Sequence, residues 1–321
     1  MKICVHLCPI QKGLNAYTQR NAEGRKGFTH NTSVTPPRPP CNNKALTMKI
    51  ERILVALDAS PHSLAALEAA AELAEKLGAE LHGLFVEDIN LLRLAQLPVA
   101  RELRYPRTIP DKLDTAQMEA QLRGQAAQAQ RHLEQISAKR QLVHSFSVMR
   151  GLVSSTLLQA AQDSDLLVLG RVSHSLVRTT RLGSTAQTAV AQTQRSVLLM
   201  HPRADLGGPP LLIYDGSPAG ERALSLAIGL TPRHGRLSIL LYTPNDEEVQ
   251  RLIEQITFQT EARQIEAAYR RLRRFHAQEV NELIRDSDSS LLILSDAYDH
   301  LPAAELNQFM EKLICPVLLV R

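Results

Sequence analysis

The feature that most constrains this chain is a strand-to-helix junction that occurs twice. The first copy is R-I-L-V-A-L-D-A-S-P, from Arg52 to Pro61, and the second is L-L-I-Y-D-G-S-P, from Leu211 to Pro218. In each, an apolar run ends in Asp and is followed by Ser and Pro, residues that begin helices. Two further matches follow in the same order: 163–170 with 286–296, and 196–200 with 315–320. The period is a whole domain, which predicts two tandem copies of one fold.

Strand-like and helix-like patterns alternate in both copies. Ile53 to Leu57 is a short, continuous apolar run, typical of a strand covered on both faces. Ser60 and Pro61 begin a helix with an apolar stripe, and Gly78 ends it. The alternation predicts two doubly wound, parallel α/β domains, Rossmann-like in architecture.

The same reading gives the remaining elements. In the first copy we expect further strands at 81–86, 143–148, 166–169 and 197–200, and helices at 91–140, 154–163 and 185–194. Pro98, Pro106 and Pro110 should break the first part of the long helical stretch. In the second copy we expect strands at 211–214, 237–242, about 264–270, 291–294 and 317–320, and helices at 218–230, 246–261, 276–285 and 302–313.

Three segments are expected along the chain: 1–47, a first domain at 48–204 and a second at 209–321. Residues 1–47 are polar, and their proline cluster at Pro36–Pro40 favours an extended chain. They are a disordered leader, a targeting or regulatory tail, or the product of a start codon assigned upstream of Met48. The Gly-Gly-Pro-Pro linker at 207–210 is short, so the two domains should pack together.

Composition excludes several classes of protein. The formal charge is +4, but 1–47 hold seven Lys or Arg and one Glu, which leaves the remainder at −2 and gives no argument for nucleic-acid binding. No apolar run is long enough to span a membrane. Three of the four cysteines precede Met48, and Cys315 has no partner in the repeats, which favours a reducing cytoplasm and no structural metal.

Candidate binding residues gather where strands of the first copy end. Asp58, Val86 and Gly170 each close a predicted strand, and ligands of open α/β sheets bind beyond these carboxyl ends. A loop from Gly170 then leads to Gly183, Ser184 and Thr185 at a helix start. Glycines allow close approach to a phosphate, and helix-start amides attract anions. Asp58 suits a divalent cation or a ribose hydroxyl, and the Val86 backbone suits an adenine edge.

These residues resemble the nucleotide loop of the universal stress protein family, over about Lys49 to Arg321. ATP-binding members have Asp after the first strand, then Gly, two residues, Gly, nine residues, Gly and Ser or Thr. Asp58, Gly170, Gly183 and Ser184 fit this spacing, while Ser173 occupies the position of the middle glycine. The resemblance implies ATP or another adenine nucleotide, with or without Mg²⁺, bound at Asp58, Val86, Gly170, Ser173, Gly183, Ser184 and Thr185, and Asp58 as the one metal contact.

The second copy departs further from the pattern. Asp215 is kept, but the loop after Leu294 has no glycine before Cys315 and carries Asp296 and Asp299, which would repel phosphate. We therefore expect this copy to act as a packing partner, either within one chain or in a homodimer.

Several residues have a structural interpretation as well. Asp58 could cap the following helix, as Asp215 would in the second copy. Arg171, His174, Arg178 and Arg181 either contact phosphates or are solvated loop charges. The run 270–274, R-R-L-R-R, has no aromatic platform for nucleic acid and is expected to be a strand with solvated ends. Cys315, before Pro316, is expected to be a small buried residue.

The sequence thus predicts an adenine-nucleotide-binding module of a stress response. The alternatives are a nucleotide-free interaction scaffold and a slow ATPase. An enzyme is disfavoured because the chain has neither a Walker loop nor a nucleophile paired with His174.

Overall fold

The computed structural model describes residues 49–97, 101–102, 111–112, 114–171, 182–201, 204–243, 245–273, 275–295 and 303–321. Leu46–Arg321 make one compact unit. The leader expected at 1–47 lies outside the described residues.

The first half of the described chain contains the cleft discussed below. Its helices are α1 (Pro61–Leu77), α2 (Ile89–Ala95), α3 (Thr115–Arg140), α4 (Val153–Ala161) and α5 (Ser184–Gln192). Its strands are β1 (Arg52–Leu57), β2 (Glu80–Asp88), β5 (His144–Gly151), β6 (Leu166–Gly170) and β7 (Ser196–Met200), with a short antiparallel pair, β3 (Arg101–Glu102) and β4 (Asp111–Lys112), between α2 and α3.

The second half follows the same plan. Its helices are α6 (Pro218–Leu230), α7 (Asp246–Glu261), α8 (Ala277–Asp286) and α9 (Ala303–Lys312). Its strands are β8 (Pro210–Tyr214), β9 (Arg236–Leu241), β10 (Glu266–Arg271), β11 (Leu291–Ser295) and β12 (Val317–Val320).

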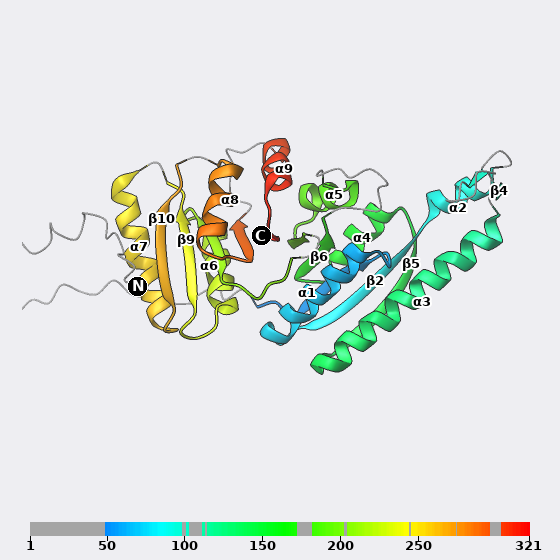
Figure 1. The fold of residues 1–321 in the computed structure, drawn as a ribbon, viewed down its shortest axis with the longest axis horizontal. Helices are drawn as coiled ribbons and strands as arrows, with labels where there is room; N and C mark the ends of the chain where they lie inside the picture. Colours follow the sequence, from blue (N-terminus) through cyan, green and yellow to red (C-terminus); the bar gives the residue numbers. More distant parts are fainter. Residues whose placement is uncertain are drawn as a thin grey trace, which may run out of the picture. The chain divides into compact units, whose positions relative to one another are not determined.

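One ten-stranded sheet joins the two halves (Figure 1), in the order β10-β9-β8-β11-β12-β7-β6-β1-β2-β5. Read outward from the centre, each half has its fifth, fourth, first, second and third strand, all parallel, which is a doubly wound α/β arrangement. The halves meet where β7 pairs antiparallel with β12, with Leu198 opposite Leu318. The predicted fold class is confirmed.

Local sequence explains why the two junctions fold alike. The Ser60 side chain accepts a hydrogen bond from Ser63 N at the start of α1, and the Ser217 side chain accepts one from Gly220 N at the start of α6. A proline follows each cap and fixes the first helical turn. At the other end of α1, Gly78 adopts a left-handed conformation with φ of 68°.

Helices cover both faces of the sheet. Buried side chains of α1, α3, α6 and α7 pack on one face, and those of α4, α5, α8 and α9 on the other. Cys315 belongs to the second of these cores at 6% exposure, which confirms its interpretation as a small buried residue. Burial raises the pKa of its thiol to about 12, so the thiol is not an activated nucleophile.

Two further expectations can be compared with the structure. The stretch 91–140 is helical in two pieces, the end of α2 and all of α3, with the interruption in its first part as expected. The three prolines lie outside the described residues. The basic run 270–274 begins in strand β10, where Arg270 is exposed and lies 3.7 Å from Asp286. Among the described residues, no helix is both long and apolar enough to cross a membrane.

Candidate functional site

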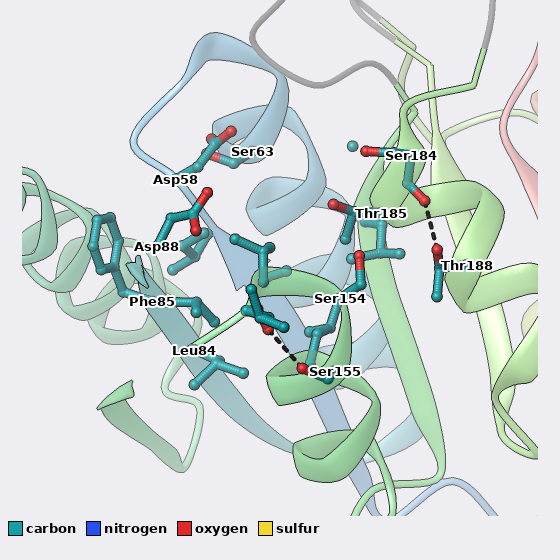
Figure 2. A pocket seen from close by; sticks show the side chains of 18 of the residues that line it. Asp58, Ser63, Leu84, Phe85, Asp88, Ser154, Ser155, Ser184, Thr185 and Thr188 are labelled. Atoms are coloured by element: carbon teal, nitrogen blue, oxygen red, sulfur yellow. Dashed lines mark hydrogen bonds between the residues drawn. The ribbon is translucent and has the colours of Figure 1, made fainter. Parts of the chain in front are cut away.

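A cleft of about 780 Å³ opens at the carboxyl ends of β1, β2 and β6 in the first half. Five of the predicted site residues line it: Asp58, Val86, Gly170, Ser184 and Thr185. Figure 2 shows the carboxylates of Asp58 and Asp88 on one side and the hydroxyls of Ser184 and Thr185 on the other, with Ser154 next to Thr185. Residues from separate strands and helices therefore meet at the edge of the sheet where the sequence placed them.

The floor of the cleft is apolar. Leu84 on β2, Leu157 on α4 and Leu169 on β6 line it, and all three are buried within the core on that face of the sheet. Their burial is set by strand and helix packing rather than by the cleft. A flat aromatic group can contact such a floor without displacing any side chain.

Asp58 lies at the tight turn between β1 and α1. Its Oδ1 accepts a hydrogen bond from Ser60 N at 2.9 Å, and Asp215 Oδ1 accepts one from Ser217 N at 3.0 Å in the second half. The interpretation of Asp58 as the helix cap is wrong, because Ser60 is the N-cap of α1, and Asp58 instead stabilises the turn that precedes it. Because it is also exposed and lines the cleft, this role is compatible with a ligand contact.

Val86 lines the cleft just beyond the last residue of β2 that pairs with β1. The last pair between these strands is Leu57 with Phe85, while β2 continues to Asp88 beside β5. The predicted strand end at Val86 is therefore two residues short, because pairing with β5 prolongs the strand. The extension carries Asp88 to the rim, where its Oδ1 accepts a hydrogen bond from Asn90 N at 2.8 Å and caps α2. Sequence reasoning missed this second carboxylate.

Gly170 ends β6 in close contact with the first turn of α1. A Cβ atom added at Gly170 would lie 3.2 Å from both the Cβ and the carbonyl oxygen of His62. A side chain at this position would therefore require the first turn of α1 to shift by a few tenths of an ångström, whatever Gly170 does toward a ligand. His62 itself lines the cleft.

The start of α5 forms one wall of the cleft. Gly183 is the N-cap, with φ of −61° and ψ of 152°, and no side chain caps the helix. Ser184, Thr185 and Thr188 face the cleft, and Thr188 Oγ1 donates to Ser184 O at 2.9 Å. An uncapped helix start presents its amides and the positive end of its dipole to an anion.

A second helix start, absent from the sequence interpretation, faces the same cleft. Helix α4 has Leu152 as its N-cap without a side-chain hydrogen bond, and Ser154 and Ser155 line the cleft. The available signal was Gly151 at the end of a strand, followed within five residues by Ser, Ser and Thr. Since the carboxyl ends of parallel strands share one edge of a sheet, this run could have been placed beside Asp58.

Some predicted loop contacts lie outside the described residues, namely Ser173, His174, Arg178 and Arg181. Arg171 is described, and neither interpretation of it holds. It is 4% exposed, and its guanidinium donates to the carbonyls of Met310, Glu311 and Leu313 at the end of α9. The guanidinium is therefore hydrogen-bonded to backbone carbonyls of the second half rather than to phosphate or solvent.

Comparison with known proteins agrees with this geometry. The model of the universal stress protein family matches residues 49–201, which include β1 to β7 and the whole cleft. Residues 49–201 belong to the universal stress protein family. No curated protein sequence matches the chain.

Solved structures similar to this one include full-length neighbours. A universal stress protein from Archaeoglobus fulgidus is 13% identical with a TM-score of 0.61, covering 84% of this chain and 97% of its own. A putative universal stress protein from Pseudomonas aeruginosa is 15% identical with a TM-score of 0.50, covering 85% of this chain and 94% of its own. At these identities the likeness concerns the fold, and it extends over both halves.

The cleft of the universal stress protein domain has acidic side chains in its described lining. Its described lining includes the carboxylates of Asp58 and Asp88 but neither Lys nor Arg. Attraction for an anion can therefore come, within the described lining, from helix-start amides, hydroxyl groups and the imidazole of His62. A cation that bridges carboxylate and anion would supply the rest.

The second half differs at the positions that form the cleft. By strand register, Tyr242 corresponds to Val86, and continuing the β10 register places Phe275 where Leu152 stands. The Tyr242 and Phe275 rings meet edge to face with centroids 4.8 Å apart, and Phe275 contacts Phe309 at 5.2 Å. Side chains of the second half thus fill the space that is open in the universal stress protein domain.

Proposed function

We propose that this chain is a tandem universal stress protein whose first domain, 48–204, binds ATP or another adenine nucleotide in the cleft. The observation that carries the proposal is the convergence of two uncapped helix starts, of α4 and α5, on a cleft with an apolar floor. An adenine nucleotide has a matching division into a flat base and an anionic chain. The second domain, 209–321, would pair with the first rather than bind nucleotide.

In the proposed complex each residue has one task. The phosphates lie at the start of α5, where the amides after Gly183 and the hydroxyls of Ser184 and Thr185 donate to them. Asp58 contacts a ribose hydroxyl or a bound cation. Next to Val86, the β2 backbone that extends past β1 reads the adenine edge. Gly170 and Ser173 complete the site proposed from the sequence.

Magnesium fits this site only as a companion of the nucleotide. In the described part of the chain, no three acidic, His or Cys side chains come together as a metal site. Mg²⁺ commonly binds through one or two carboxylates and substrate phosphates, and Asp58 would be the protein contact.

The role we infer is ligand-dependent signalling in a stress response, in the cytoplasm and without catalysis, nucleic acid or membrane. A nucleotide-free scaffold is the second candidate, favoured by the absence of Lys and Arg from the described lining of the cleft. A slow ATPase is the third, and it would require a residue that activates water for attack on the phosphate.

Mass spectrometry of small molecules released from the purified, heat-denatured protein tests the proposal directly. We expect an adenine nucleotide, or, if the protein is purified empty, calorimetric binding of ATP with Mg²⁺ at one site per chain. Asp58→Ala should weaken binding at least about tenfold, which corresponds to about 1.4 kcal/mol. Asp215→Ala removes the same kind of turn contact in the second half and should leave affinity unchanged. Two equivalent sites, or a loss only in the Asp215 variant, would contradict the assignment.

A further inference from the structure

The main chain of Arg171 connects the sheet to the start of α5, at the end of the cleft proposed for the phosphates. Arg171 follows Gly170, and its amide continues the ladder with β7 by donating to Met200 O at 2.9 Å. Its carbonyl accepts a hydrogen bond from Gly183 N at 3.0 Å. Because Gly183 is the N-cap of α5, the position of Arg171 determines where the helix begins relative to β6.

The Arg171 side chain leaves the cleft and enters the second half. Its guanidinium donates to Leu313 O at 2.6 Å, to Met310 O at 2.5 Å and to Glu311 O. These carbonyls belong to the last turn of α9 and the residue after it, where helical carbonyls lack intrahelical partners and the dipole is negative. A buried guanidinium with three such acceptors is held in one place.

The same turn of α9 also forms a hydrogen bond with the segment that leads into α5. Glu311 Oε1 accepts a hydrogen bond from Leu182 N at 3.3 Å, and Leu182 immediately precedes the N-cap. Helix α9 packs against both α5 and α8 (Figure 1). Arg171 and Leu182, which both precede α5, are therefore each hydrogen-bonded to Glu311 or its neighbours.

We propose that the second half is a positioning element for the nucleotide site, acting through Arg171 and Glu311. Neither side chain lines the cleft, so neither is a ligand contact. They hold the first turn of α5 at the distance from Asp58 and β6 at which its amides face the phosphates. Helix-start attraction falls off within one turn, so a displaced turn loses it. This inference rests on the proposed function.

Another arginine that links the two halves, Arg321, provides a matched control. Arg321, after β12, donates to Val190 O and Thr193 O, at the opposite end of α5 from the phosphates. It fastens the two halves by the same chemistry without touching the start of α5. Arg321→Ala therefore weakens the junction between the halves but should leave the nucleotide site intact.

The test compares Arg171→Lys, Glu311→Ala and Arg321→Ala with the unaltered full chain. Arg171→Lys keeps the charge but has no fork for three carbonyls, and Glu311→Ala, at a half-buried position, guards against a folding failure of the first variant. By calorimetric titration with ATP and Mg²⁺, we expect roughly tenfold weaker binding for the first two and a change within about twofold for the third. Equal affinities in all proteins, or an equal loss in Arg321→Ala, would overturn the inference.

A second readout separates this inference from the proposed function. In the unliganded proteins, hydrogen exchange of the segment 182–188 reports the bonded amides Gly183 N and Gln187 N. We expect faster exchange there in Arg171→Lys and Glu311→Ala than in Arg321→Ala, whether or not ATP binds. If the unaltered chain binds no adenine nucleotide, the proposed function fails, and unchanged exchange in the first two variants would refute positioning by α9 independently.

Discussion

Replacing Val86 with Tyr and Leu152 with Phe transfers the aromatic pair of the second half into the cleft of the first. Both positions accept bulk, because Val86 is partly exposed and Leu152 is 48% exposed at the cleft. We therefore expect a change in the free energy of unfolding within about 0.5 kcal/mol per site, as is usual for surface positions. The rings would occupy the apolar floor on which a base could lie.

The expected effect on binding follows from the surface that is lost. One face of a purine is on the order of 100 Å² of apolar surface, which at about 25 cal/mol/Å² is worth about 2.5 kcal/mol. The double variant should bind ATP about 60-fold more weakly in a calorimetric titration, since 1.4 kcal/mol is a factor of ten. The reciprocal variant, Tyr242→Val with Phe275→Leu, removes ring contacts worth about 0.5–1.5 kcal/mol of stability. Because Phe275 contacts Phe309 of α9, it should weaken binding by no more than about tenfold, the loss expected when α9 no longer positions α5. Unchanged affinity in the first variant would refute the placement of the base in this cleft.

Three further predictions concern stability. Ala59 has a φ of 58° in the turn that carries Asp58, and the equivalent residue of the second half is Gly216. Ala59→Gly should therefore raise the free energy of unfolding, measured in urea, by about 1 kcal/mol. A lower free energy of unfolding would show that the Ala59 methyl group stabilises the turn. Tyr214→Phe removes a buried hydroxyl that donates to the charged side chain of Glu221, and should lower the free energy of unfolding by about 1.5–3 kcal/mol. In the control Tyr269→Phe the lost partner is the neutral Thr257, so the free energy of unfolding should fall by about 1 kcal/mol. Equal losses in the two variants would show that the charged acceptor adds nothing. The pKa of Cys315 is raised in the folded chain, so its contribution to the free energy of unfolding is retained below about pH 9 and declines by up to about 1.4 kcal/mol per pH unit as the pH rises toward 12. This pH dependence should be absent in Cys315→Ala. Identical slopes of stability against pH in both proteins would be evidence against thiol burial as the cause.

Much of the fold could be predicted because its signals are local. Helices α6 and α7 and strand β12 have the expected bounds, since a serine and proline begin α6 and continuous apolar runs mark buried strands. The cleft residues from Asp58 to Thr185 could be brought together because strand ends share an edge in any doubly wound sheet. The pairing of β7 with β12 was anticipated only as packing of two domains, because strand register between distant segments has no local sequence signal.

Arg171 illustrates why the remainder could not be predicted. In the sequence it follows a glycine of a predicted phosphate loop and precedes several basic residues, so a phosphate contact and a solvated loop charge were the two interpretations. Its actual partners are about 140 positions away, at the end of a helix in the other half. Backbone carbonyls carry no sequence signature, because every residue has one. A side chain bound only to carbonyls can therefore be assigned only from the fold.

The two halves share one frame, so the difference between an open cleft and a filled one must lie in a few side chains. Gly170 lies against His62 in the first half. At the equivalent positions of the second half the strand residue is the larger Ser295 and the helix residue is the smaller Ala219. Val86 and Leu152 leave space where Tyr242 and Phe275 fill it. The second half thus exchanges an open cleft for a packed aromatic core, and that core contains Phe309 of α9, the helix whose last turn holds Arg171. A rigid α9 is what the first half needs in order to keep the start of α5 in place. Filling one cleft and positioning the other are, on this argument, two consequences of the same packing.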